Sequence, residues 1–116
     1  CLYCVTDSTA AAGMPDGEYK LGSHTVTKCL GGVRLADGTL AGSTLTMDQA
    51  LRNLVKIGLP ISEASQRLSQ FPADYLGLEE RGRLQPGSFA DCVRLDRSLT
   101  LTDVMVEGET IDFKNA

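Results

Sequence analysis

The spacing of hydrophobic positions changes twice along the chain and divides it into three predicted parts. Residues 17–38 carry short apolar runs between glycine-containing turns, which predicts a β-rich excursion. From residue 47 to residue 76 the spacing becomes helical, and from Gly82 onward it returns to a period of two. The strands expected in the two β-rich parts are residues 18–21, 25–29, 33–35, 90–95, 100–106 and 109–111.

The strongest helix prediction covers residues 47–57. Thr46 and Gln49 have the spacing of a capping box at its start, and Gly58 with Pro60 stops it. A second helix is predicted at about 62–70, followed by one or two turns at 72–76. The apolar stripe of the first helix has helical spacing and consists of Met47, Ala50, Leu51, Leu54 and Val55.

The first apolar run, residues 2–6, is predicted as a short buried strand. It stands at the very beginning, with no initiator Met, no polar lead-in and no signal-peptide pattern. We therefore expect the chain to be a piece of a longer protein.

Composition narrows the class of protein. The 116 residues suit one modest domain or part of a larger one. Acidic residues exceed basic ones, giving a formal charge of −4, and no basic cluster occurs, so a nucleic-acid partner is not expected. No apolar run approaches the roughly 20 residues needed to span a bilayer, so no membrane partner is expected either.

The cysteines and the single histidine do not form a metal motif. Cys1 and Cys4 have C-x-x-C spacing, but on a strand their thiols would point to opposite faces. Cys29, Cys92 and His24 lie far along the chain, so a zinc site would need further ligands at defined spacing. Buried, reduced cysteines in a cytoplasmic protein and a surface histidine are the expectation.

Asp7 is the first candidate for chemistry. It directly follows the strand predicted at residues 2–6, and α/β folds place catalytic groups at the carboxyl ends of strands. There a carboxylate could act as a general acid or base. The alternative is a turn or cap aspartate, which the local sequence Asp-Ser-Thr favours on its own.

The second candidate is the segment 37–43, DGTLAGS, just before the first predicted helix. Its small residues would let a ligand approach the backbone, and a helix N-terminus favours anions. It lacks the lysine and the spacing of a P-loop, so a tight connecting loop is the alternative that its sequence favours.

Two long segments nevertheless resemble one enzyme family. Residues 5–17 (VTDSTAAAGMPDG) and 37–47 (DGTLAGSTLTM) closely resemble the C-terminal part of N-acetylglucosamine-6-phosphate deacetylases. The helix around 50–55 continues the match, and residues 82–91 (GRLQPGSFAD) are similar to the less specific closing signature of the amidohydrolase superfamily. Together these segments extend over nearly the entire chain.

The resemblance implies an α/β fold, the C-terminal portion of a metal-dependent hydrolase (β/α)8 barrel with part of a small β-sandwich. Residues 1–81 would end the barrel, with its last strand, a β-rich active-site loop and its last helices. Residues 82–116 would be C-terminal strands of the sandwich. The missing N-terminal part of the enzyme would be a partner, and the intact protein a homodimer.

The resemblance also implies the activity, hydrolysis of the acetamide of N-acetylglucosamine 6-phosphate by metal-activated water. Asp7 matches the aspartate that takes the proton of the water and returns it to the departing amine. Leu40, Ala41 and Gly42 match a sugar-contacting loop. The divalent metal, zinc or iron, would be bound by residues missing from this chain, since His24 matches none of the family's ligands. The chain alone is therefore expected to be inactive.

Two rival interpretations stay open from the sequence. Another metal-dependent amidohydrolase, acting on a cyclic amide, would share the closing signature but not both long segments. A free-standing, non-enzymatic β-rich assembly module would need a self-contained core.

Overall fold

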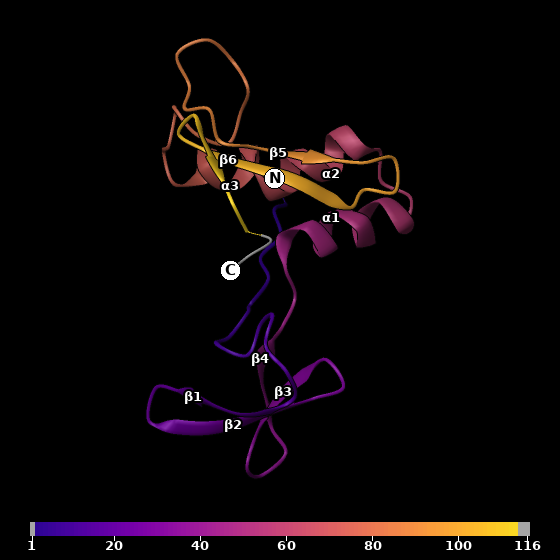
Figure 1. The fold of residues 1–116 in the computed structure, drawn as a ribbon, viewed down its shortest axis with the longest axis vertical. Coiled ribbons are helices and arrows are strands. Elements are labelled where there is room, and N and C mark those ends of the chain that lie inside the picture. Colours follow the sequence, from indigo (N-terminus) through magenta and orange to yellow (C-terminus); the bar gives the residue numbers. More distant parts are fainter. Residues whose placement is uncertain (1, 114–116) are drawn as a thin grey trace. The chain divides into compact units, whose positions relative to one another are not determined.

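The computed structural model describes residues 2–113, which form two compact units, Val5–Ala50 and a unit of residues 2–4 with 51–113. The boundary between the units falls inside a helix, α1 (Met47–Lys56). The combination of two sheets and three helices among the described residues is consistent with the predicted α/β class, and Figure 1 shows these elements along the chain.

The unit Val5–Ala50 is built on a four-stranded antiparallel sheet. Its strands are paired in the order of the sequence, so each turn is a hairpin, and Tyr19 faces Val26 across the first of them. The β-rich excursion predicted from the turns is confirmed. The strands are β1 (Gly17–Leu21), β2 (His24–Cys29), β3 (Gly32–Leu35) and β4 (Leu40–Ser43).

A small core lies under this sheet. Ala11, Val26 and Val33 are fully buried, and Tyr19, Leu35 and Ala41 pack against them. Ala11 comes from the loop that follows Asp7, so the candidate segment is attached to the sheet by apolar packing as well as by hydrogen bonds. The side chains alternate between the two faces of β2, which explains why only Val26 of that strand is buried.

The other unit contains the helices and a second sheet. After α1 come α2 (Ile61–Leu68) and α3 (Gln70–Tyr75), and a three-stranded antiparallel sheet follows. The predicted helices and the final hairpin are confirmed, although the second helix ends before residue 70. The strands are β5 (Cys92–Leu95), β6 (Leu101–Val106) and β7 (Glu109–Ile111).

Two local predictions are wrong. Residues 2–6 are not a strand, and Leu2 and Val5 are 69% and 68% exposed, because no described strand pairs with this run or covers its side chains. Residues 40–43 are not a plain connecting loop: they form β4, which pairs with β3 across a β-bulge. Among residues 2–113, no helix has both the length and the apolar character needed to cross a membrane.

Candidate functional site

Asp7 lies in an irregular segment just before Ser8, its backbone is left-handed with φ of +53°, and its side chain is exposed. This conformation is unfavourable for most residues, but aspartate adopts it more readily than most. The Asp7 carboxylate makes no hydrogen bond or ion pair with residues 2–113, so it is free to meet a ligand.

The segment around Asp7 is hydrogen-bonded to β4. The Ser43 amide donates to the Asp7 carbonyl oxygen at 2.8 Å, and the Thr9 amide donates to the Ser43 carbonyl oxygen at 3.1 Å. These bonds form an isolated parallel bridge between Ser8 and Ser43. The structure therefore brings together Asp7 and the 40–42 segment, the two candidate sites that the sequence could only treat separately.

Gly42 is the point of closest approach. It is buried, with φ of +154°, and a β-carbon built on it would lie 2.7 Å from the Thr9 methyl carbon. The same β-carbon would lie 3.1 Å from the Asp7 carbonyl oxygen and 4.0 Å from Asp7 Oδ2. Only glycine leaves room for the Asp7 segment here, which gives a physical reason for the small residues of the motif.

The remaining residues of the 37–43 segment have distinct roles. Leu40 is 63% exposed, whereas Ala41 packs against the core of the sheet. A hydrogen bond from the Thr39 hydroxyl, followed by one from the Thr39 amide, lowers the pKa of the Asp37 carboxyl. Asp37 thus fixes the turn between β3 and β4, which leads directly into the strand that carries Gly42.

The described residues do not supply a metal site of their own. No group of three or more His, Cys, Asp or Glu side chains within residues 2–113 could hold a metal ion. His24 is exposed at the first position of β2, as expected. Cys4, Cys29 and Cys92 are free thiols, but Cys29 is exposed and the other two are only half-buried, so the expectation of buried cysteines is wrong for these three. Cys1, for which packing was predicted, lies outside the described residues. The residues present therefore do not fit the divalent metal that the resemblance implies.

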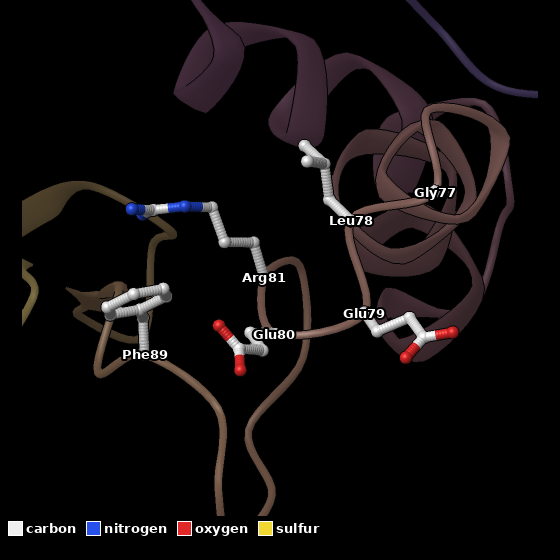
Figure 2. Close-up of a pocket in the computed structure, with 6 residues that line it drawn as sticks. All are labelled: Gly77, Leu78, Glu79, Glu80, Arg81 and Phe89. Carbon is white, nitrogen blue, oxygen red and sulfur yellow. The ribbon is translucent and has the colours of Figure 1, made fainter.

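The connection 79–81 carries a cluster of charged and aromatic contacts. Arg81 forms ion pairs with Asp91, at 2.5 Å, and with Glu107, and its guanidinium carbon lies 4.2 Å from the centre of the Phe89 ring. Figure 2 shows the guanidinium above that ring, while the Glu79 side chain points away from it. Arg81, Phe89, Glu79 and Glu80, together with Gly77 and Leu78, line a hollow of about 330 Å³.

Asp91 has a structural role in this cluster. A hydrogen bond from the Glu107 backbone amide at 2.8 Å lowers the pKa of the Asp91 carboxyl, and the Arg81 guanidinium lowers it further. Asp91 thus joins the 79–81 connection to the turn between β6 and β7. The last residue of the closing signature 82–91 therefore has a structural contact with the small sheet.

Comparison with known proteins places the chain among sugar-phosphate deacetylases, although no family model matches it. It is 42% identical over 97% of its length to an Escherichia coli K12 protein named "Putative N-acetylgalactosamine-6-phosphate deacetylase", of which it spans 68%. It is 41% identical over 92% of its length to the N-acetylglucosamine-6-phosphate deacetylase of Lysinibacillus sphaericus, of which it spans only 28%.

Solved structures agree with these relatives. The N-acetylglucosamine-6-phosphate deacetylase of Thermotoga maritima matches 94% of this chain with a TM-score of 0.86 and 44% identity. An aspartate-to-alanine variant of the Mycobacterium smegmatis enzyme, in complex with N-acetyl-D-glucosamine-6-phosphate, matches 94% of the chain with a TM-score of 0.85 and 41% identity. In each case the chain spans 30% of the solved structure.

Proposed function

Because the chain belongs to the N-acetylglucosamine- and N-acetylgalactosamine-6-phosphate deacetylase family, we propose that Asp7 and the segment Leu40, Ala41 and Gly42 form part of a deacetylase active site. The reaction is hydrolysis of the acetamide of N-acetylglucosamine 6-phosphate. The observation that carries the proposal is the parallel bridge between Ser8 and Ser43, which brings both candidate segments together within one compact unit.

In this proposal Asp7 moves the proton. Its exposed carboxylate takes a proton from the attacking water as the water oxygen bonds to the amide carbon. It then returns the proton to the nitrogen as the carbon–nitrogen bond breaks, which yields glucosamine 6-phosphate and acetate. An aspartate-to-alanine variant of a similar enzyme has been solved in complex with N-acetyl-D-glucosamine-6-phosphate. This supports the view that an aspartate in this family can be lost without loss of substrate binding.

Leu40, Ala41 and Gly42 contact the sugar in this proposal. Gly42 lets β4 approach the Asp7 segment closely, and the 63% exposed side chain of Leu40 offers an apolar contact for the sugar ring. The zinc or iron ion that the resemblance implies would be held by residues outside this chain.

The finer fold follows from the same family. We propose that residues 1–81 are the last part of a (β/α)8 barrel and residues 82–116 are strands of a small β-sandwich. The chain spans about 30% of the solved structures, which supports a longer enzyme whose N-terminal part completes both. In that setting residues 2–6 would gain the neighbouring strands that they lack here.

A second substrate is favoured by one specific observation. The N-acetylgalactosamine-6-phosphate deacetylase of Escherichia coli O157:H7 is 42% identical to the chain over 97% of its length. The galactosamine and glucosamine sugars differ only in the orientation of one ring hydroxyl. Both sugar phosphates therefore have to be assayed, and the ratio of their kcat/KM values decides between them.

The test of the proposal is Asp7→Asn in the full-length enzyme that carries this chain. We expect turnover to fall by about 100-fold or more, since general acid–base catalysis contributes that much, while substrate binding is retained. The 116-residue chain alone, supplied with zinc, is expected to release no acetate. Turnover near that of the unaltered enzyme would remove Asp7 from the mechanism, and activity of the chain alone would refute the need for further residues.

A further inference from the structure

We propose that Ser43 is a positioning residue for Asp7. This inference rests on the proposed function, since it gives Ser43 a purpose only if Asp7 moves the proton. Ser43 ends β4 and is half-buried beside the Asp7 segment. It contacts that segment with its backbone amide, its carbonyl oxygen and its hydroxyl, and these contacts lie on both sides of Asp7.

The backbone of Ser43 holds Asp7 and the residue two positions after it. Its amide donates to the Asp7 carbonyl oxygen at 2.8 Å, and its carbonyl oxygen accepts from the Thr9 amide at 3.1 Å. The Thr9 hydroxyl donates to the same carbonyl oxygen at 3.4 Å. A residue of any type at position 43 could form the backbone bonds, so they do not by themselves explain a serine.

The hydroxyl supplies what only a small polar side chain can. Ser43 Oγ donates to the carbonyl oxygen of Thr6, the residue just before Asp7, and accepts from the Leu45 amide at 3.1 Å. The Ser43 side chain thereby links Thr6, just before Asp7, to Leu45, just after β4. With the backbone bonds, the peptide groups before and after Asp7 are both fixed.

Asp7 depends on this support. Its left-handed backbone, with φ of +53°, is less favourable than the common regions even for aspartate, so contacts with the surroundings help to maintain it. Its carboxylate has no hydrogen-bond partner among residues 2–113 that could orient it. The backbone therefore sets the position from which the Asp7 side chain projects, and Ser43 makes bonds that hold that backbone.

The experiment compares Ser43→Ala with a matched control in the full-length enzyme. Ser43→Ala deletes both hydroxyl bonds and leaves the backbone bonds in place. We expect kcat to fall about tenfold, the low end of the effect of losing a supporting hydrogen bond. KM should stay within about twofold, because the sugar contacts are not removed. Thr44→Val deletes the neighbouring hydroxyl, which donates to the Gly31 carbonyl oxygen at 3.1 Å, and should leave kcat unchanged.

Two conservative variants keep the test decisive if Ser43→Ala folds poorly. Ser43→Thr retains the hydroxyl and should recover most of the lost kcat, whereas Ser43→Cys retains the size with a weak donor and should recover little. Equal kcat for Ser43→Ala and the unaltered enzyme would overturn the inference, as would equal recovery by threonine and cysteine. A large loss in Asp7→Asn beside such a result would leave the proposed function standing, whereas full turnover in Asp7→Asn would remove both.

Discussion

The two compact units of the chain are stabilised by different kinds of contact. The unit Val5–Ala50 is held by backbone bonds, by serine and threonine hydroxyls, and by a core of Ala11, Val26 and Val33. The other unit buries only small side chains in its two later helices, Ala64 and Ala73. It relies on charged contacts, among them those of Arg81 with Asp91 and Glu107.

The two kinds of contact have different effects: one positions residues of the candidate site, and the other stabilises the fold. Short bonds to the backbone fix the position of a chosen peptide group, which a proton-transfer residue such as Asp7 requires. Partly exposed ion pairs hold strands together but are weakened by salt and by acid. We therefore expect changes near β4 to affect catalysis first and changes near Arg81 to affect stability first.

Gly42→Ala should have the largest effect on catalysis. The new β-carbon would meet the Thr9 methyl carbon at 2.7 Å and the Asp7 carbonyl oxygen at 3.1 Å, and φ of +154° disfavours alanine. Because the Asp7 carbonyl oxygen accepts from the Ser43 amide, the clash has to move the Asp7 segment. We expect kcat of the full-length enzyme to fall about 100-fold, the cost of misplacing a catalytic group by about 1 Å.

Gly38→Ala is the matched control for this clash. It lies in the same 37–43 segment and has φ of +88°, but a β-carbon there would meet nothing within 4 Å. It should reduce stability without a comparable loss of kcat. Thr9→Ser removes the methyl group at 2.7 Å and should partly restore the Gly42→Ala enzyme. A Gly38→Ala loss as large as that of Gly42→Ala would show that backbone strain, and not contact with Asp7, is responsible.

Gly82→Ala tests the other unit and should act on stability. A β-carbon at Gly82 would lie 2.6 Å from the Ser69 carbonyl oxygen and 2.7 Å from the Ala73 β-carbon, and φ is +78°. We expect the free energy of unfolding of the chain to fall by about 2–3 kcal/mol, as strain and overpacking add. Thermal and urea unfolding followed by circular dichroism measure this loss.

Gly87→Ala is its control, because φ there is +90° and nothing lies within 4 Å of a β-carbon. It should cost only about 1 kcal/mol, the contribution of backbone strain alone. The amide resonances of Ser43 and Thr9 should keep their chemical shifts in both variants. Equal losses in the free energy of unfolding for Gly82→Ala and Gly87→Ala would refute the close packing of Gly82 against Ser69 and Ala73.

Elements that depend on nearby residues could be predicted from the sequence. The hairpins follow from their turns, and α1 follows from its apolar stripe together with Gly58 and Pro60. The strand predicted at residues 2–6 is absent because an apolar run becomes a strand only when another strand pairs with it, and none of the described strands does. Local pattern cannot reveal whether such a partner exists.

The pattern of hydrophobic and polar residues cannot predict contacts between residues that are far apart in the sequence. Asp7 and the 37–43 segment were each noticed, but their meeting depends on bonds such as that from Ser43 Oγ to the Thr6 carbonyl oxygen, 37 positions apart. Arg81 was missed for the same reason, since its partners lie 10 and 26 positions away. The sequence shows a small polar residue, Ser43, directly after Leu-Ala-Gly, but it does not show that the hydroxyl bonds to Thr6.

Asp91→Asn should have the smallest effect, and its size should depend on pH. Asparagine can still accept from the Glu107 amide, but it loses the ion pair with Arg81. The Glu107 amide, and then Arg81, lower the pKa of the Asp91 carboxyl in the folded chain. A lowered pKa stabilises the fold above the unfolded value of about 3.9, and this stabilisation is lost as pH falls through the lower folded value.

The variant should therefore melt at a lower temperature than the original chain at pH 7, and the two melting temperatures should converge as the pH falls below about 4. Salt at about 1 M should narrow the gap at pH 7, because it screens the pair with Arg81. Glu79→Gln removes a carboxylate that points away from this cluster and should leave the melting temperature nearly unchanged. A gap that stays constant from pH 7 to pH 3 would show that the charge of Asp91 does not stabilise this unit.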